Sequence, residues 1–216
     1  MTDVTQDLVQ QKDALLEAAL PDVVFDGWSM AALRAGADRI GLDPGAIVSL
    51  FPEGPYAAAL WLDDWADRHM LDALETMDLA GMKVRERVAA GVMARLEALA
   101  PHREAVRRAL ALKATPWGAL KAAESVYRTV DAIWYAAGDN STDFNYYTKR
   151  SLLAAAYVPA VLYWLNDRSA DAADTKDFLV RRLDDVLQLP KLGQRMRETM
   201  NRAAGPLRAL RRELRS

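Results

Sequence analysis

The sequence predicts an all-α protein, and three observations lead to this prediction. Apolar residues recur at intervals of three and four along almost the whole chain, which is the spacing of one face of an α-helix. Stretches in which apolar and polar residues alternate, as they do in a half-buried strand, are almost absent. Of the 216 residues, 51% are hydrophobic, so the chain can bury a substantial core.

Residues 1–55 are predicted to form a small unit of three helices. The first covers about residues 5–19, and Pro21 with the turn at residues 25–28 is expected to end it. Ser29 is a suitable N-cap for the second helix, because its hydroxyl can accept a free backbone N–H, and Gly41 is expected to close that helix. The inward faces of these two helices are expected to hold Leu8, Leu15, Ala19, Met30, Leu33, Ala37 and Ile40.

The third short helix is expected to begin with Asp43 as N-cap and Pro44 at its first position. Together with the second helix it has the shape of a helix-turn-helix. The segments at residues 15–20, 25–33 and 41–46 resemble TetR-family regulators. That resemblance implies a TetR-like fold, in which an N-terminal helix-turn-helix unit precedes a larger helical domain for ligand binding and dimerisation.

The charge of the N-terminal unit argues against DNA binding. Residues 1–56 carry three basic and nine acidic side chains, a net charge of −6, and residues 43–51 contain no Lys or Arg. Affinity for DNA depends mainly on basic groups near the phosphates, so an acidic surface is expected to repel the polyanion. We therefore expect no nucleic-acid partner, and a ligand-responsive TetR-type regulator is the alternative hypothesis.

Residues 56–190 are predicted to form a larger helical domain for lipid binding. Its helices are expected at about residues 56–77, 83–99, 102–113, 117–137, 142–166 and 172–189. The longest apolar run, residues 152–165, is shorter than a membrane span and contains Pro159, so we expect a buried helix that is kinked or broken there.

The chain lacks the residue patterns of the catalytic and metal-binding motifs considered. It contains no cysteine, its two histidines are far apart, and it has no glycine-rich phosphate loop. The acidic pairs Asp63-Asp64 and Asp184-Asp185 are expected to be solvated or salt-bridged, because adjacent helical residues diverge in direction. We therefore predict no enzyme activity, no metal and no cofactor.

The central helices combine bulky aromatic residues with many alanines. Small residues opposite large ones can leave an apolar cavity, although ordinary core packing would produce the same pattern. The residues predicted to contact a lipid or quinone are Tyr127, Trp134, Tyr157, Val161 and Trp164.

The segment from Ile133 to Arg150 brings an acid, two aromatic residues and an arginine to one side of a helix start. Aromatic residues and arginine gathered on a surface are typical of binding sites, and the segment lacks the residue set of a known catalytic motif. The residues in question are Asp143, Tyr146, Tyr147 and Arg150. An unrecognised enzyme that uses this cluster is a third hypothesis.

Residues 191–216 carry eight basic and two acidic side chains, a net charge of +6. An apolar stripe with basic flanks favours contact with an anionic membrane surface, although packing on its own domain, an acidic partner or a disordered tail would also fit. Gly205-Pro206 is expected to break or kink the helix predicted at about residues 192–215. The predicted membrane-binding residues are Arg195, Met196, Met200, Arg202, Leu207, Arg208, Leu210 and Arg211.

Residues 137–150, Ala-Gly-Asp-Asn-Ser-Thr-Asp-Phe-Asn-Tyr-Tyr-Thr-Lys-Arg, closely resemble the COQ-nine family of ubiquinone biosynthesis. The resemblance covers most of the chain and includes residues 25–28, 32–37, 50–52, 133–135 and 178–185. It implies a non-enzymatic, dimeric, TetR-like protein that binds isoprenoid quinone intermediates in an apolar pocket.

The same resemblance implies a partner and a location. Family members are expected to sit on membranes through a C-terminal amphipathic helix and to present the lipid to the demethoxyubiquinone hydroxylase. The hydroxylase-facing patch would contain Ile133, Asp143, Tyr146, Tyr147 and Arg150. Tyr146 departs from the tryptophan usual in the family, and it loses ring area and the indole N–H. The absence of a transit pattern predicts a bacterial member, cytoplasmic and peripheral to the inner membrane.

Overall fold

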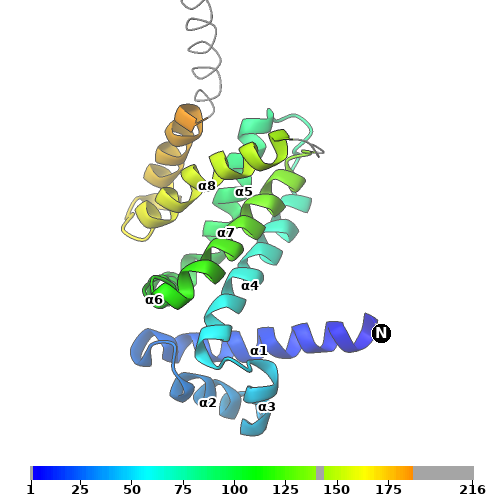
Figure 1. Cartoon of the computed structure of the whole chain (residues 1–216), viewed down its shortest axis with the longest axis vertical. Coiled ribbons are helices and arrows are strands. Elements are labelled where there is room, and N and C mark those ends of the chain that lie inside the picture. Colours follow the sequence, from blue (N-terminus) through cyan, green and yellow to red (C-terminus); the bar gives the residue numbers. More distant parts are fainter. Residues whose placement is uncertain (1, 140–143, 187–216) are drawn as a thin grey trace, which may run out of the picture.

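The computed structural model describes residues 2–139 and 144–186, and all its regular elements in those ranges are helical. A small unit of three helices lies at one end, and α4 leads from it into a larger bundle (Figure 1). The elements are α1 (Thr2–Asp26), α2 (Met30–Arg39), α3 (Pro44–Leu50), α4 (Pro55–Glu75), α5 (Val84–Leu99), η1 (Ala100–His102), α6 (Arg103–Lys113), α7 (Pro116–Ala136), α8 (Phe144–Trp164) and η2 (Ala170–Ala172), followed by a helix over residues 173–186. The predicted all-α class is confirmed.

The two N-caps predicted in the small unit are present. The Ser29 hydroxyl accepts the Ala32 backbone N–H at 3.1 Å, and the Asp43 carboxylate accepts the Gly45 N–H at 3.1 Å. Gly41 follows α2 with a φ of +68°, a left-handed conformation that glycine adopts without strain. The core of this unit consists of Leu15, Ala19, Leu33, Ala37, Ile47, Leu50, Phe51 and Ala58.

Three expectations for the small unit are wrong. Pro21 does not end the first helix: α1 continues to Asp26, with Val23 packed into the core. The carbonyl that loses its N–H partner is that of Glu17, an exposed residue, where water can satisfy it. Leu8 is exposed because the first half of α1 extends past the other helices (Figure 1). Ile40 is 43% exposed because it is the C-cap of α2, beyond the buried turn.

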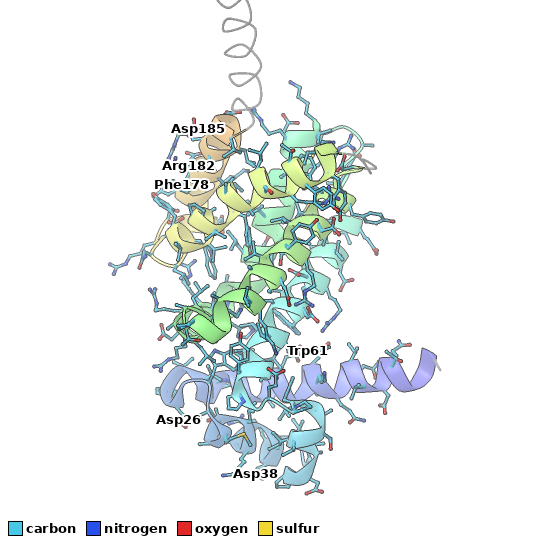
Figure 2. The ribbon with its side chains drawn as sticks, in the orientation of Figure 1. Asp26, Asp38, Trp61, Phe178, Arg182 and Asp185 are labelled. Carbon is cyan, nitrogen blue, oxygen red and sulfur yellow. The ribbon has the colours of Figure 1, made fainter. Side chains whose placement is uncertain are left out.

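Two tryptophans join the small unit to the bundle. The Trp61 indole on α4 donates to Asp13 of α1 at 2.7 Å, and the Lys12 ammonium lies 4.4 Å from the Trp61 ring (Figure 2). The Trp28 indole donates to the Ala105 carbonyl of α6 at 3.0 Å. Both rings pack against the cores of the two regions, so α1 is held against the bundle by side chains as well as by the chain connection.

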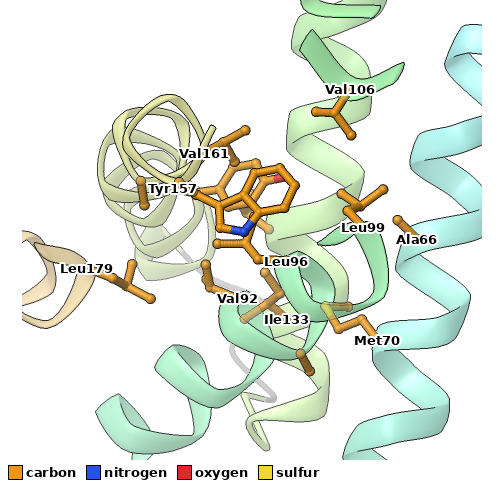
Figure 3. Packing of buried hydrophobic residues seen from close by; sticks show 14 of the residues in the cluster. Ala66, Met70, Val92, Leu96, Leu99, Val106, Ile133, Tyr157, Val161 and Leu179 are labelled. Carbon is orange, nitrogen blue, oxygen red and sulfur yellow. The ribbon is translucent and has the colours of Figure 1, made fainter. Parts of the chain in front are cut away.

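The larger core lies between α4, α5, α7 and α8. Figure 3 shows Tyr157 and Val161 of α8 facing Leu96 and Leu99 of α5, with Val106 of α6 nearby. Residues 173–186 form an outer helix beside α8 (Figure 1). Phe178 in that helix stacks on Tyr163, and Asp184 forms an ion pair with Arg85 of α5.

Pro159 does not break α8, which continues from Phe144 to Trp164. The carbonyl that loses its N–H partner is that of Ala155, an exposed residue, and water can satisfy a carbonyl on the solvent side of a helix. Among the helices that the structure describes, none combines the length and apolar character needed to cross a bilayer. The predicted helix at residues 192–215 lies outside the described residues.

Candidate functional site

A cavity of about 650 Å³ lies between α4, α5, α6, α7 and α8. That volume is within the range of small-molecule sites. Alanine side chains end at Cβ, so they fill little of the space between the helices on this side. The alanines lining it are Ala109, Ala114, Ala119, Ala122, Ala123 and Ala154.

One edge of the cavity has apolar side chains in contact with solvent. Val158 and Leu162, both on α8, are 40% and 52% exposed, and Tyr127 on α7 is 38% exposed. Exposed apolar side chains next to a cavity provide a surface over which an apolar ligand can enter or emerge. We call this edge the apolar rim.

Another part of the cavity lining carries a charged network on α4, α5 and α6. The Lys113 ammonium lies 2.5 Å from the Asp63 carboxylate, and the Ser125 hydroxyl donates to the same carboxylate oxygen at 2.6 Å. Burial raises the pKa of Asp63, but the cations Lys113 and Arg95 and the hydrogen bonds lower it further, so that it stays below the ordinary 3.8.

The network continues to α5 through Arg95, whose side chain is only 3% exposed. Its Nε donates to Asp67 at 2.6 Å, and the Thr129 hydroxyl donates to the same carboxylate at 3.0 Å. Burial raises the pKa of Asp67 above 3.8 despite these partners. Burial also raises the pKa of Tyr157, so this phenol stays neutral. We call Asp63, Asp67, Arg95 and Lys113 the wall network.

A second charged cluster lies where α7 and α8 meet, close to the apolar rim. Arg150 donates to Asp131 at 2.6 Å and to Asp139 at 3.1 Å, and its guanidinium lies 3.4 Å from the centre of the Tyr146 ring. The Tyr146 hydroxyl donates to Asp131 at 2.9 Å. Hydrogen bonds with Tyr127 and Asp131 raise the pKa of Tyr146 to about 12. We call Asp131, Asp139, Tyr146 and Arg150 the rim cluster.

The structure separates the residues predicted to contact a partner. Tyr147 is 64% exposed, and Tyr146 is half-buried with its edge against the Tyr147 ring. Asp143 lies outside the described residues. Among the members of this set that the structure describes, Tyr147 has the side chain most available for contact.

Two of the predicted partner contacts are corrected. Ile133 is completely buried, at a point where a Cβ on Gly91 would lie 3.1 Å from the Ile133 Cγ2, so α5 and α7 touch there. Arg150 is 3% exposed, and its guanidinium donates hydrogen bonds to Asp131 and Asp139. The buried side chains of Ile133 and Arg150 are therefore not exposed for direct contact with another protein. The Arg150 guanidinium packs instead against the face of the Tyr146 ring.

The residues predicted to bind a lipid do not share one cavity. Tyr127, Tyr157 and Val161 line the cavity of about 650 Å³. Trp164 lines a different cavity, of about 780 Å³, between α5 and the helix of residues 173–186. Trp134 is buried, with its indole donating to the Lys149 carbonyl at 3.0 Å, and it lines a smaller cavity of about 270 Å³. Trp134 and Trp164 line other cavities because each lies seven residues, about two helical turns, beyond Tyr127 and Tyr157 on the same helix. Their contact with a lipid stays a prediction.

The predicted membrane-binding residues, Arg195, Met196, Met200, Arg202, Leu207, Arg208, Leu210 and Arg211, lie outside the described residues. Their role stays a prediction.

The sequence reasoning missed the wall network. Asp63 was expected to be solvated or salt-bridged, and the ion pair is confirmed; what was not expected is that this pair is largely buried and shared with Arg95. One signal was available: Asp63 and Asp67 are four residues apart on one helix face, among the apolar residues Leu62, Ala66 and Met70. Arg95 likewise interrupts an apolar run at residues 92–96. Opposite charges inside two apolar faces indicate a buried ion pair.

The described helices define the class of protein: an all-helical protein with a TetR-like fold and a cavity that is lined mostly by apolar residues. The crystal structure of the TetR transcriptional regulator from Nitrosomonas europaea ATCC 19718 matches with a TM-score of 0.67, at 23% sequence identity, over 82% of this chain and 98% of that one. At this identity the likeness concerns the fold alone.

Residues 119–190 match the model of the COQ9 family. Over 81% of its length the chain is 34% identical to the ubiquinone biosynthesis protein COQ9, mitochondrial, of Drosophila melanogaster, and over 88% it is 30% identical to the proteins of that family from Dictyostelium discoideum and Homo sapiens. The chain belongs to the COQ9 family, the COQ-nine family of the sequence resemblance. It spans 55%, 64% and 62% of the length of these three relatives, respectively.

Proposed function

We propose that this chain is a non-enzymatic accessory protein of ubiquinone biosynthesis that binds isoprenoid quinone intermediates and presents them to the demethoxyubiquinone hydroxylase. The observation that carries the proposal is the alanine-lined cavity of about 650 Å³ behind an exposed apolar rim. Relatives that are named ubiquinone biosynthesis proteins support the pathway. The family resemblance supports the hydroxylase as partner.

The cavity supports a lipid as ligand because its walls are mostly aliphatic. An isoprenoid tail has no hydrogen-bonding groups, so it gains from removal of apolar surface from water and needs only a matching shape. Val106, Leu110, Val126 and Val161 provide such a surface beside the alanines.

The neighbourhood of the rim cluster supports presentation of the lipid to a partner. Tyr127 and Arg150 line the cavity, while Tyr146 contacts Arg150 and Tyr147 projects from the next position of α8. A protein bound over Tyr147 would therefore lie close to the apolar rim. An exposed tyrosine is also a frequent anchor in protein interfaces.

The remaining parts of the proposal concern assembly and location. We propose a homodimer that is peripheral to the bacterial inner membrane, with the basic stripe of residues 191–216 on the anionic surface. Reversal of charge at Arg202, Arg208 and Arg211 is expected to lower binding to anionic vesicles while thermal stability stays nearly unchanged.

Mass spectrometry of lipids extracted from the native protein tests the function. We expect an isoprenoid quinone or its precursor, at a lower level in Ala154→Phe, which fills the cavity, than in Ala155→Phe, which adds the same ring at the adjacent exposed position. Protein that is free of lipid and ignores anionic vesicles would contradict the proposal. Turnover of a quinone precursor by the purified protein alone would support an enzyme instead.

A TetR-type ligand-responsive regulator is the second candidate, favoured by the fold of α1–α3 and by the TetR structure that matches. Its difficulty is charge, because α3 has no basic residue and Asp26 and Asp38 lie on the surface of the same unit (Figure 2). Salt-sensitive binding to the promoter of its own operon would favour this candidate.

A further inference from the structure

The lining of the cavity includes a charged hydrogen-bond donor, the Lys113 ammonium, among mostly apolar residues. Lys113 is the last residue of α6, and only 8% of its side chain is exposed. Its neighbours along the cavity are the aliphatic residues Leu62, Ala109, Leu110 and Ala122. An ammonium group in such a place loses hydration, and hydrogen bonds must replace the lost water contacts.

The hydrogen bonds of Lys113 leave part of this donor free. An ammonium group carries three N–H bonds, and within the described residues its hydrogen-bond acceptor is the Asp63 carboxylate at 2.5 Å. The Ser125 hydroxyl donates its proton to the same oxygen, so its lone pairs remain able to accept. The cavity wall therefore offers a cationic donor and a neutral acceptor side by side.

The charges around this pair restrict the kind of ligand. Asp63 and Asp67 balance Lys113 and Arg95, so the wall network is neutral as it stands. A carboxylate or phosphate beside Lys113 would add an uncompensated negative charge close to the buried Asp63. A neutral oxygen can accept from Lys113 without that repulsion.

We propose that Lys113 and Ser125 form the headgroup site of the cavity, and that they bind the neutral oxygens of an aromatic ring such as a quinone or a phenol. This proposal rests on the proposed function, in which the cavity holds an isoprenoid quinone intermediate. Lys113 donates to a carbonyl, methoxy or hydroxyl oxygen of the ring, and Ser125 accepts from a ring hydroxyl where one is present. The isoprenoid tail then occupies the aliphatic part of the cavity.

Three probes with tails of equal length test the headgroup site on the full-length protein: ubiquinone with a three-unit isoprenoid tail, the hydrocarbon farnesene, and farnesoic acid. Dissociation constants come from quenching of tryptophan fluorescence. We expect Lys113→Met to weaken quinone binding about tenfold, the scale of one hydrogen bond to a charged group, and to leave farnesene binding unchanged. Lys121→Met is the matched control, because Lys121 pairs with Glu53 on the surface away from the cavity wall.

Ser125→Ala provides a second variant if Lys113→Met does not fold, because it keeps the Asp63–Lys113 ion pair. We expect it to weaken binding of the quinol, the reduced form of the same ubiquinone and an additional probe here, more than that of farnesene. Equal loss of quinone and farnesene binding in Lys113→Met, or tighter binding of farnesoic acid than of the quinone by the unaltered protein, would overturn the headgroup site. Failure of all three probes to bind the unaltered protein would instead contradict the proposed function.

Discussion

The wall network and the rim cluster have the same chemical pattern in different surroundings. Each has an arginine that is 3% exposed and lies between two carboxylates. In the wall network both carboxylates are largely buried, at 18% and 15% exposure, whereas Asp131 in the rim cluster is 41% exposed. The first arrangement joins α4 and α5 and the second joins α7 and α8, so the same pattern serves the cavity wall in one place and a surface in the other.

The comparison teaches how burial changes the role of an ion pair. When every partner is buried, removal of one charge leaves the others without compensation. When one partner reaches solvent, water can replace much of what is lost. The two clusters should therefore respond differently to the same kind of substitution.

The largest effect is expected for Arg95→Leu, which leaves Asp63 and Asp67 without their shared cation. We expect a loss of about 3–5 kcal/mol in the free energy of unfolding, measured by urea denaturation. Arg128→Leu is the control, because the pair of Arg128 with Asp64 is 56% and 29% exposed and should contribute about 0–1 kcal/mol. Similar losses of unfolding free energy in Arg95→Leu and Arg128→Leu would mean that the buried wall network contributes no more to stability than an exposed ion pair.

A smaller loss is expected for Arg150→Leu. Asp139, at 6% exposure, loses one of its partners, while Asp131 becomes hydrated, so we expect a loss of about 2 kcal/mol. Arg182→Leu removes an exposed pair with Asp185 and serves as the control. A larger loss of unfolding free energy in Arg150→Leu than in Arg95→Leu would contradict the expectation that the wall network contributes more to stability than the rim cluster.

The two carboxylates of the wall network should give opposite pH dependences. The lowered pKa of Asp63 stabilises the fold above pH 3.8, and this contribution is lost as the pH falls through the folded-state value. The raised pKa of Asp67 favours the folded state at acid pH, and that contribution is lost as the pH rises from 3.8 through the folded-state value.

Unfolding by urea between about pH 3 and pH 6 separates these contributions through the linkage of stability to protonation. Asp63→Asn should make stability rise less steeply with pH at the acid end. Asp67→Asn should remove a decline in stability that occurs as the pH rises just above 3.8. Changes of the same sign in both variants would contradict the assigned directions.

The smallest effect on stability is expected for Tyr147→Ala, since this side chain is 64% exposed. We expect a change within about 0.5 kcal/mol. Its binding to the hydroxylase should fall more than its binding to the quinone, because the ring lies outside the cavity lining. Phe25→Ala, which removes an 82% exposed ring from the small unit, should change neither hydroxylase binding nor quinone binding. Equal loss of hydroxylase and lipid binding in Tyr147→Ala would remove the distinction between rim and cavity.

Helices were predictable because local signals specify them. The hydroxyl of Ser29 and the carboxylate of Asp43 cap helices within three residues of their own positions, so no distant contact is needed. Pro21 was misjudged because its effect depends on its surroundings: Val23 packs into the core beyond it, and the Glu17 carbonyl that it leaves without a partner belongs to an exposed residue. Local propensity yields to such contacts.

The site was less predictable than the fold. Tyr127, Tyr157 and Val161 line one cavity, as the aromatic and aliphatic content of the central helices indicated. Trp134 and Trp164 line other cavities, because each lies about two helical turns further along its helix than Tyr127 and Tyr157. Arg150 was assigned to a partner surface, yet Asp131 and Asp139 draw it inward, and spacing along α8 alone cannot reveal partners on α7 and in the connection after it.

The sequence by itself determined the helical class, the caps of the small unit and the family, because periodicity, capping chemistry and shared residues are properties of short stretches of chain. Only the tertiary structure decided which charged side chains line the cavity. Asp63 and Lys113 are 50 residues apart, and Asp131 and Arg150 are 19 apart, and each pair meets only after helices pack. Burial then sets the energy of these contacts, because the cost of an unpaired charge depends on how much water the fold excludes around it.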